Sequence, residues 1–541
     1  MADKVYVSVN EGKIKGTRKM SNFSGVEYFS FLGVPYGQPP VGSARFKDPV
    51  KIKPWKDTLD ATFERDGCRQ FSLLKRDFLG SEDCLYNNIH TPQLPKENEP
   101  LKSVIVCIHP GGYCYGSADP SQFGSPEFIM HHDIVYVCVN HRLHILGYLN
   151  VGLKECSGCQ GLKDVILSLE WIKDNINVFG GDPNNITLMG SSSGSAIVHA
   201  LMFAPRAKGL FHKAVLMGMY GLNPTLVTQH EHVTNAFELA KSLGYDGTAD
   251  DRKRLLAFYK KVDIDDILLL RPEALFSQNK IAMFPASTFL PTVDEEDDIQ
   301  PGTLQELVPS TVRVPMMIGF CENEGAMGFV RLFKEKFRNN FYSTLTQNVW
   351  SCGSELTEQD LKKIEKQAEM FYLNGQSTHK ASLSQKCDIQ TDIALSDVYN
   401  SLINIVAEDL PSSVFVYRFD FEGSIPTIKD KVMALLDEPL KGTCHGDDYS
   451  YWAMVKDHWR KLDYIILPKT REMIEKFTKL ITTFAKTGDP NYKGLEVHWK
   501  PSSIENPYYL SINDPCTLIE GKLNGKRMEF WENIKKQFSD R

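Results

Sequence analysis

Residues 185–203 read Asn-Ile-Thr-Leu-Met-Gly-Ser-Ser-Ser-Gly-Ser-Ala-Ile-Val-His-Ala-Leu-Met-Phe, and they predict a strand, a tight turn and a helix in direct succession. The run up to Gly190 predicts a short buried strand, and residues 193–203 predict a helix. Between them, Gly190-Ser191-Ser192-Ser193-Gly194 fits the pattern G-x-S-x-G, which places a serine on a strained strand-to-helix turn. A serine-rich helix cap is the alternative, since serine is a good N-cap residue. The strand before and the helix after favour a nucleophile at Ser192.

A serine nucleophile needs a base that takes its proton and N–H donors that hold the oxyanion. The N–H group of Ser193, directly after the nucleophile, is one such donor. His109-Pro110-Gly111-Gly112-Tyr113 follows a predicted strand, and two of its glycines lack side chains that would keep a substrate away. A plain glycine turn is the alternative. Beside the serine turn, we expect Gly111, Gly112 and Ser193 to form an oxyanion hole.

Other apolar runs predict the rest of a parallel sheet. The predicted strands lie at residues 5–9, 103–109, 134–140, 185–190, 213–217, 312–320 and 413–419, and the predicted helices at residues 162–178, 193–203 and 470–486. Continuous apolar strands, each followed by a helix, are typical of a mostly parallel sheet that helices cover on both faces. The predicted fold class is therefore α/β, with one domain over residues 1–541 and large helical insertions over the C-terminal edge of the sheet.

The composition and the sequence patterns limit the classes of partner and the cellular location that we expect. The chain is 42% hydrophobic and 24% charged with a formal charge of −7, and its Lys and Arg are scattered, so we expect no nucleic-acid partner. No apolar run approaches the roughly 20 residues of a membrane-spanning helix. The first residues open into a strand pattern rather than an apolar signal segment, so we expect a cytoplasmic protein; a secreted form whose signal was removed is the alternative. Cys156-Ser157-Gly158-Cys159 is a lone C-x-x-C without a histidine cluster, so we expect no metal site.

Several further motifs are spread along the chain. They are Phe31-Leu-Gly-Val-Pro-Tyr-Gly-Gln-Pro-Pro-Val-Gly-Ser-Ala-Arg-Phe46, Glu82-Asp-Cys-Leu-Tyr-Asn87, Asn140-His-Arg-Leu-His-Ile-Leu-Gly-Tyr148, Phe179-Gly-Gly-Asp-Pro-Asn-Asn-Ile-Thr187, Leu210-Phe-His-Lys-Ala214 and Phe484-Ala-Lys-Thr-Gly-Asp-Pro-Asn491. With the serine turn, these blocks resemble the carboxylesterase/cholinesterase family of α/β-hydrolases, most like insect carboxylesterases. The likeness runs from about residue 5 to Trp531. It implies the α/β-hydrolase fold and ester hydrolysis that needs no cofactor.

The family order of serine, acid and histidine implies the two partners of Ser192. The acid lies in Asn323-Glu324-Gly325, after the strand predicted at residues 312–320, so the resemblance implies Glu324. The base lies in Gly442-Thr-Cys-His445-Gly446, so it implies His445, which Glu324 would orient. The remaining late histidines fit less well, because only His445 lies in a glycine-flanked loop that could reach a sheet edge. The others lie in a polar stretch, a predicted helix and beside a turn: His379, His458 and His498.

Two positions depart from the family pattern. Ser191 stands before the nucleophile, where the family usually has glutamate, and Gly218 stands where the family has a serine. Family analogy places Ser191, Gly218 and Asp448 near one another behind the triad. Losing a carboxylate and a hydroxyl together avoids a buried charge without a partner. We therefore expect a less anionic site that favours neutral, apolar esters.

The loop from Cys68 to Cys84 resembles the first disulfide loop of the family. It holds no tryptophan, so the platform on which cholinesterases stack choline is missing. The resemblance implies a disulfide, whereas a reducing cytosol would leave free thiols, and the sequence leaves this point open.

The function expected is that of a serine carboxylesterase that hydrolyses neutral esters, of xenobiotic, odorant or lipid-like character, through an acyl-enzyme on Ser192. One alternative is a slow scavenger that binds esters or organophosphates. Another is an enzyme like juvenile-hormone esterase, although that group's glutamine before the nucleophile is absent. An adhesion protein that has lost catalysis is a further alternative, but this chain keeps all three residues of the triad. The sequence does not indicate an oligomeric state.

Overall fold

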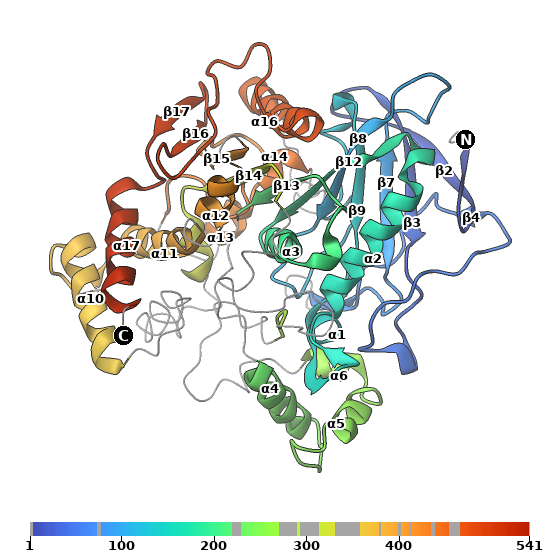
Figure 1. Cartoon of the computed structure of the whole chain (residues 1–541), viewed down its shortest axis with the longest axis horizontal. Coiled ribbons are helices and arrows are strands. Elements are labelled where there is room, and N and C mark those ends of the chain that lie inside the picture. Colours follow the sequence, from blue (N-terminus) through green and yellow to red (C-terminus); the bar gives the residue numbers. More distant parts are fainter. Residues whose placement is uncertain are drawn as a thin grey trace.

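The computed structural model describes residues 4–72, 77–218, 229–269, 289–292, 313–329, 357–377, 380–398, 402–410, 413–433, 439–453 and 466–539. One large sheet runs through the molecule in the order β1-β2-β3-β7-β9-β8-β12-β13-β14-β15-β16-β17, with β4 beside β2 (Figure 1). Its strands are β1 (Lys4–Val9), β2 (Gly12–Met20), β3 (Glu27–Pro35), β4 (Leu59–Asp60), β7 (Tyr86–Thr91), β8 (Lys102–Ile108), β9 (Val135–Val139), β12 (Gly181–Ser191), β13 (Lys213–Met217), β14 (Met316–Cys321), β15 (Val414–Phe419), β16 (Tyr508–Ile512) and β17 (Thr517–Glu520).

The centre of this sheet is parallel and its edges are antiparallel. The strands from β9 to β16 along this order pair in parallel. The pairs β1–β2, β2–β3, β3–β7 and β7–β9 at one edge, and β16–β17 at the other, are antiparallel, while the short β4 pairs in parallel with β2. The predicted mostly parallel sheet is confirmed. Several predicted boundaries differ from the observed ones. β14 begins at Met316, directly after Pro315, which has no N–H group to give the ladder. β12 begins at Gly181 rather than at residue 185, and α2 ends at Asn175 rather than at residue 178.

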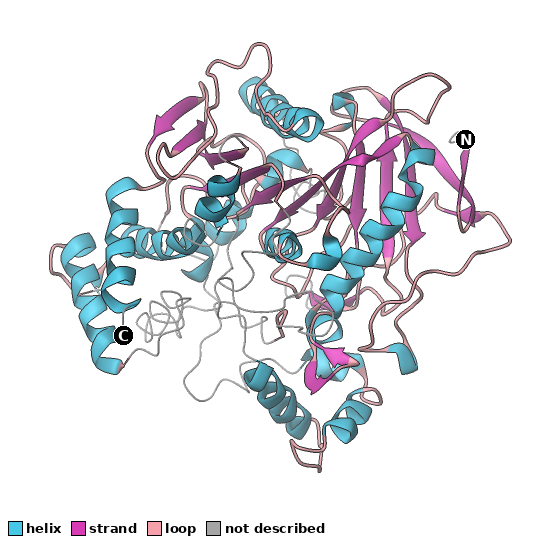
Figure 2. Ribbon diagram, viewed as in Figure 1, coloured by secondary structure: helices cyan, strands magenta, loops and turns pink. Residues whose placement is uncertain are grey.

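Alternate side chains of the central strands enter two separate cores, as the two-residue period of a strand requires. In β8, Val104 and Val106 belong to the core that also contains apolar side chains of α2 and α3. Ile105 and Cys107 belong to the core on the other face, with side chains of α14 and α16. Figure 2 shows helices on both sides of the strands. The helices that cover this sheet are α2 (Gln160–Asn175), α3 (Ser193–Met202), α14 (Tyr449–Trp452) and α16 (Pro468–Thr487).

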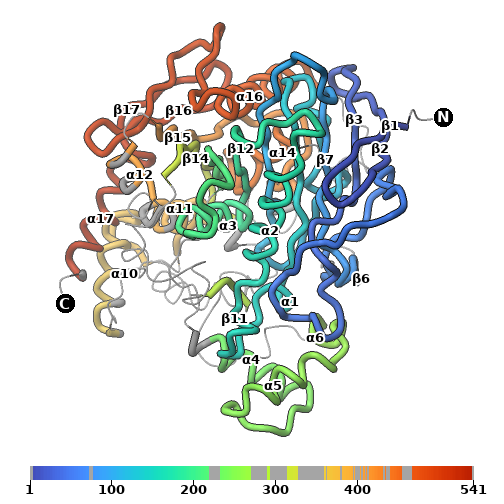
Figure 3. The backbone as a smooth tube through the Cα atoms, turned by 45° about the vertical axis from the view of Figure 1, so that its right-hand side comes forward, coloured from blue at the N-terminus to red at the C-terminus, as the bar shows by residue number. Residues whose placement is uncertain are grey.

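Two further groups of helices lie away from the central layers. The first group packs on the hairpin β10 (Asn150–Leu153) and β11 (Cys156–Ser157) around a small core of its own, below the sheet in Figure 3. The second group lies at the opposite side of the molecule from β1 (Figure 3). The remaining helices are α1 (His144–Tyr148), α4 (Gln229–Ser242), α5 (Arg252–Tyr259) and α6 (Ile264–Leu269), then α10 (Glu358–Leu373), α11 (Leu383–Val398), α12 (Asn404–Asp409), α13 (Ile428–Met433) and α17 (Gly525–Ser539).

Cysteines serve different structural roles in this fold. Cys68 and Cys84 form a disulfide, with Cα atoms 4.9 Å apart. The sequence left open whether these two cysteines are bonded or free, and in the structure they are bonded. The thiol of Cys156 donates to the carbonyl of Leu149, and that of Cys159 to the carbonyl of Thr292. In the part of the chain that the structure describes, no group of three metal-binding side chains occurs, and no helix is long and apolar enough to cross a membrane.

Candidate active site

Ser192 lies at the turn between β12 and α3 in a strained backbone conformation, with φ 54° and ψ −122°. A non-glycine residue with positive φ is uncommon and persists only where its surroundings hold it. Here the N–H group of Ser192 donates to the carbonyl of Met217 at 2.8 Å, which ties the turn to the end of β13. The carbonyl of Ser192 accepts from the hydroxyl of Ser195 at 2.6 Å. The turn therefore holds its serine at the carboxyl end of the parallel strands.

The two glycines of G-x-S-x-G are required by close packing. A Cβ atom on Gly190 would lie 2.3 Å from the carbonyl of Gly194, and one on Gly194 would lie 2.3 Å from the carbonyl oxygen of Ile108. Contacts that short are not tolerated between a side chain and backbone. The start of α3 thus lies directly against the end of β8, from which the predicted oxyanion loop departs.

The three residues of the predicted triad form one hydrogen-bonded series. The Oγ atom of Ser192 lies 2.8 Å from Nε2 of His445, and Nδ1 of His445 lies 2.5 Å from Oε2 of Glu324. A carboxylate can only accept, so Nδ1 carries the proton and the neutral ring is left with Nε2 as the acceptor of the serine proton. The other carboxylate oxygen of Glu324 accepts from the N–H group of Cys321 at 2.6 Å. This is the arrangement in which a histidine can act as the base for a serine.

The loops that carry Glu324 and His445 are joined side by side. Asn323 pairs with Cys444 in an isolated parallel bridge, and the N–H group of Asn323 donates to the carbonyl of Thr443 at 2.9 Å. The side-chain amide of Asn323 donates to the carbonyls of Lys441 and Thr443, at 2.8 and 3.2 Å. The acid loop follows β14 and the histidine loop follows β15 in sequence. These contacts set the distance between the carboxylate and the imidazole.

Three carboxylates act on the imidazole. Burial alone lowers the pKa of His445, but the charge and hydrogen bond of Glu324, with smaller effects of Asp448 and Asp447, raise it above its ordinary value. Burial, and then the charge of Glu324, raise the pKa of Asp448 to about 6. Burial likewise raises the pKa of Asp447 to about 7. The site is thus rich in acids that hold their protons more tightly than ordinary carboxyl groups do.

The predicted oxyanion loop has the backbone that its glycines permit. Gly111 and Gly112 adopt φ values of 135° and 62°, and a Cβ atom on Gly111 would lie 1.8 Å from the carbonyl oxygen of Tyr115. The carbonyl of Gly111 accepts from the N–H groups of Cys114 and Tyr115, both at 3.1 Å. Among the described residues, none accepts a hydrogen bond from the N–H groups of Gly111, Gly112 or Ser193. Free N–H groups of this kind are what an oxyanion needs.

Ser191, Gly218 and Asp448 were expected near one another behind the triad, and each has different surroundings in the structure. A Cβ atom on Gly218 would lie 3.2 Å from Nδ1 of His445, so the missing side chain leaves room for the imidazole. Asp448 acts on Glu324 and His445 through its charge, while its two oxygens accept from the hydroxyl of Tyr417 and the N–H group of Tyr449, both at 2.8 Å. The hydroxyl of Ser191 is buried and has no hydrogen-bond partner among the described residues. It is therefore not bonded to Asp448.

Some supporting residues were not predicted from the sequence. The ring of His109 stacks on that of His141, with centroids 4.7 Å apart and planes 9° apart, and Nδ1 of His109 donates to the carbonyl of Pro110 at 2.8 Å. These contacts brace the start of the oxyanion loop. Tyr417 was missed as well, although it holds Asp448. The only sequence signal was the position of His109 directly before Pro110, and nothing paired it with His141.

A serine on a strand-to-helix turn, backed by histidine and glutamate at the carboxyl ends of a parallel sheet, defines a serine hydrolase of the α/β-hydrolase fold. The model of the carboxylesterase family matches residues 3–531. The chain belongs to the carboxylesterase family and is a carboxylic ester hydrolase, as the sequence predicted.

Individual relatives support this assignment. Esterase E4 of Myzus persicae is 28% identical over 517 residues, which cover 92% of this chain and 88% of that protein. Juvenile hormone esterase of Heliothis virescens is 29% identical over 551 residues, which cover 97% and 92% of the two chains. The crystal structure of juvenile hormone esterase from Manduca sexta, with OTFP covalently attached, matches with a TM-score of 0.83 at 24% identity, over 99% of this chain and 100% of that one. This last likeness shows the shared fold.

Proposed function

We propose that this chain hydrolyses neutral, apolar carboxylic esters through an acyl-enzyme on Ser192. The observation that carries the proposal is the buried series in which Ser192 Oγ lies 2.8 Å from His445 Nε2 and His445 Nδ1 lies 2.5 Å from Glu324. A serine hydroxyl becomes a useful nucleophile only when such a base takes its proton. In this proposal Ser192, His445 and Glu324 are the catalytic triad.

The geometry supports a two-step acyl transfer. His445 takes the proton of Ser192 as the oxygen attacks the ester carbonyl, and Glu324 stabilises the imidazolium that forms. The oxyanion then accepts hydrogen bonds from the N–H groups of Gly111, Gly112 and Ser193. The imidazolium gives its proton to the departing alcohol. Water repeats the sequence on the acyl-enzyme, which releases the acid and restores Ser192.

The preference for neutral esters rests on the residues beside the triad. Ser191 is buried and uncharged, and Gly218 has no side chain, so neither offers a charge to a cationic alcohol group. Asp448 is a buried carboxylate that acts on His445 through its charge, and its two oxygens already accept from Tyr417 and Tyr449. A cationic ester therefore finds no free charge at Ser191 or Gly218 that would compensate for the loss of its hydration.

The nucleophile is tested by Ser192→Ala in the purified protein, with p-nitrophenyl acetate as substrate. We expect kcat/KM to fall by roughly 10⁴-fold or more, because the nucleophile is removed. Ser242→Ala is the control, since it removes an exposed hydroxyl of α4 that bonds the carbonyl of Glu238. Activity of Ser192→Ala within tenfold of the natural chain would overturn the assignment.

The preference for neutral esters is tested by Ser191→Glu beside Ser191→Gln. A carboxylate at this position should raise kcat/KM for a choline ester, relative to its neutral isostere, by about tenfold, whereas glutamine of the same size should not. If the ratio of kcat/KM for the choline ester to that for its neutral isostere were equal in the two variants, the residue at position 191 would not determine which alcohol group is preferred.

A juvenile-hormone-esterase-like activity is a second candidate, because relatives that cover most of this chain carry that name. An ester panel separates the two proposals. A general carboxylesterase should accept many acyl and alcohol groups, whereas a hormone esterase should favour the methyl ester of a long apolar acid by a large factor over short esters.

The location stays a prediction. The Cys68–Cys84 disulfide supports the secreted alternative rather than the expected cytoplasmic one, because cytosolic reductants keep most thiols reduced. Fractionation of the source tissue, with thiol alkylation before lysis, tests both points together.

A further inference from the structure

The three proposed oxyanion donors share a feature on the far side of their peptide groups. The N–H groups of Gly111, Gly112 and Ser193 each belong to a peptide whose carbonyl is that of the preceding residue. Those carbonyls, of Pro110, Gly111 and Ser192, all accept a hydrogen bond. A peptide is planar and trans, so its carbonyl and its N–H group point in opposite directions. A contact that fixes the direction of the carbonyl therefore also fixes where the N–H group points.

The hydroxyl of Ser195 holds the peptide that carries the N–H group of Ser193. It donates to the carbonyl of Ser192 at 2.6 Å, and the N–H group of Ala196 donates to the same oxygen at 3.1 Å. The bond from Ala196 is an ordinary helical bond over four residues, whereas the bond from the hydroxyl depends on one side chain. Ser195 is 0% exposed, so water does not compete for its hydroxyl.

The imidazole of His109 holds the peptide that carries the N–H group of Gly111. Its Nδ1 atom lies 2.8 Å from the carbonyl oxygen of Pro110, and because a carbonyl only accepts, Nδ1 carries the proton. Burial, and then the charge of His141, lower the pKa of His109 to about 3, so the ring is neutral. A Cβ atom on Gly116 would lie 2.4 Å from that Nδ1 atom and 2.6 Å from the carbonyl oxygen of Pro110. Only a glycine at position 116 leaves room for this hydrogen bond.

We infer that His109 and Ser195 are positioning residues, which hold and polarise two of the peptides whose N–H groups receive the oxyanion. This role rests on the function proposed above and deepens it. A hydrogen bond accepted by a carbonyl polarises its peptide, so the N–H group of that peptide becomes a stronger donor. The gain is largest when the ester oxygen becomes an oxyanion, because a neutral carbonyl interacts more weakly with the same donors. The two side chains therefore favour the tetrahedral intermediate over the bound ester.

A matched pair of inhibitors separates the oxyanion from the rest of the substrate. A trifluoromethyl ketone accepts the Oγ atom of Ser192 at its carbonyl carbon. The new C–O bond forms, the π electrons of the carbonyl move to its oxygen, which becomes the oxyanion, and the serine proton passes to His445. The corresponding secondary alcohol has nearly the same shape and cannot be attacked. The inhibition constants of both compounds are measured beside kcat/KM for p-nitrophenyl acetate, with thermal melts as a check on folding.

Ser195→Ala and His109→Leu each remove one of the two hydrogen bonds. In both variants we expect kcat/KM and the affinity for the ketone to fall together by about tenfold, which is less than the loss of a whole donor costs. The affinity for the alcohol should change by less than about twofold, because the alcohol forms no oxyanion. His109→Asn should recover most of the loss, since its side-chain amide can donate from a position close to that of Nδ1.

Ser21→Ala and His90→Leu are the matched controls. The hydroxyl of Ser21 is buried and donates to the carbonyl of Glu127 at 2.9 Å. His90 is a buried imidazole whose pKa burial lowers to about 3, and its Nδ1 atom lies 3.1 Å from the hydroxyl of Ser30. These partners lie outside the oxyanion peptides, so both controls should keep the affinity for the ketone.

Three results would overturn the inference. They are equal losses for the ketone and the alcohol, a ketone affinity within about twofold of the natural chain in both Ser195→Ala and His109→Leu, and a His109→Asn variant no better than His109→Leu. Failure of the proposed function would appear already in the natural chain, as equal affinity for the ketone and the alcohol, and it would overturn this role as well. Failure of this role alone would leave the preference for the ketone in the natural chain and in the variants alike.

Discussion

The two halves of the proposed active site are built in different ways. Ser192 is held by a local turn, in which Gly190 and Gly194 allow backbone contacts that no side chain would permit. Glu324 and His445 lie 121 residues apart, and hydrogen bonds join the loops that carry them, which follow the neighbouring strands β14 and β15. The turn is therefore rigid through packing, and the acid–base half is set by polar contacts. A mutation of the packing glycines of the turn should affect folding, whereas one in the acid–base half should affect rate.

Glu324→Gln tests the second half most severely. The amide should no longer hold Nδ1 of His445 protonated or stabilise the imidazolium, so we expect kcat to fall by about 10⁴-fold. The folded state should change little, because the glutamine keeps an oxygen for the N–H group of Cys321. Steady-state kinetics and a thermal melt check both parts. A loss below tenfold would mean that Glu324 is not the acid partner.

Gly194→Ala tests the first half. The new Cβ atom would lie 2.3 Å from the carbonyl of Ile108, so we expect the free energy of unfolding to fall by about 3 kcal/mol. Gly25→Ala is the comparison, because Gly25 has φ 71° with open space around it and should cost only about 1 kcal/mol of backbone strain. Urea denaturation measures both. Equal losses would contradict the packing argument for the turn.

Asn323→Ala tests whether the polar contacts between the two loops align Glu324 with His445. It removes the side-chain hydrogen bonds to the carbonyls of Lys441 and Thr443, so the carboxylate and the imidazole lose part of their alignment. We expect kcat to fall by about tenfold with KM nearly unchanged, since the side chain of Asn323 is buried against the histidine loop. Asn506→Ala, on the exposed surface, is the control. A change confined to KM would place the effect in substrate binding instead.

Asp448→Asn should have the smallest effect, on pH dependence. The negative charge of Asp448 contributes to the raised pKa of His445, so its removal lowers that pKa. Catalysis needs the neutral imidazole, and the acid limb of kcat/KM should therefore move to lower pH, by less than about one unit. Asp250→Asn, exposed and distant, should leave the profile in place. A shift to higher pH would contradict the sign of this interaction.

The sequence predicted the local half of the site better than the distant half. The G-x-S-x-G turn and the Gly111-Gly112 loop could be inferred from the chain around them, because strand, glycine and helix follow one another directly. Glu324 and His445 were assigned from a family resemblance, since no local pattern joins loops so far apart. The hydrogen bond from Tyr417 to Asp448 and the stack of His109 on His141 depend on contacts between strands and loops that only the folded chain brings together.

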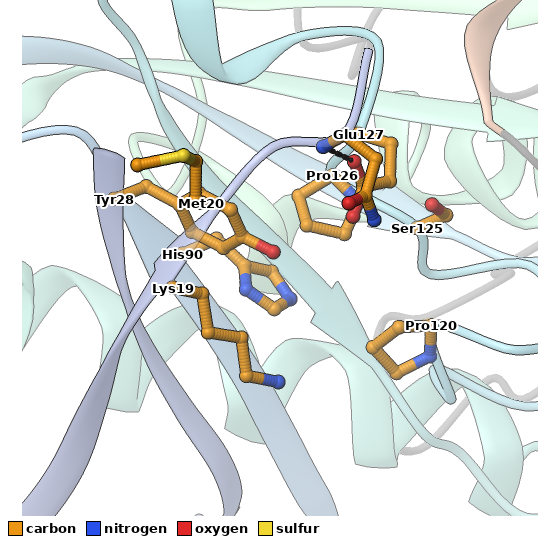
Figure 4. Close-up of a pocket in the computed structure, with 9 residues that line it drawn as sticks. Lys19, Met20, Tyr28, His90, Pro120, Ser125, Pro126 and Glu127 are labelled. Carbon is orange, nitrogen blue, oxygen red and sulfur yellow. Dashed lines mark hydrogen bonds between the residues drawn. The ribbon is translucent and has the colours of Figure 1, made fainter. Parts of the chain in front are cut away.

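For the fold as well, features set by neighbouring residues were predicted better than contacts between distant ones. The parallel core was predicted because continuous apolar strands alternate with helices, and each strand supplies side chains to two cores. The antiparallel edge was not predicted beyond its first strand, because β2, β3 and β7 carry mixed polar and apolar residues whose pairing depends on their neighbours in the sheet. The pocket drawn in Figure 4 is lined in part by strands of this edge, and nothing in the sequence brought Lys19, His90 and Glu127 together.

The role of Ser192 as the nucleophile is tested by identifying the residue that becomes acylated. The enzyme is mixed with p-nitrophenyl acetate, the release of p-nitrophenol is followed in the first turnover, and the quenched protein is digested for mass spectrometry. We expect a burst that matches the concentration of enzyme and an acetyl group on the peptide that contains Ser192, with neither in Ser192→Ala. A burst of equal size in Ser192→Ala, or an acyl group on another residue with Ser192 unmodified, would contradict the account.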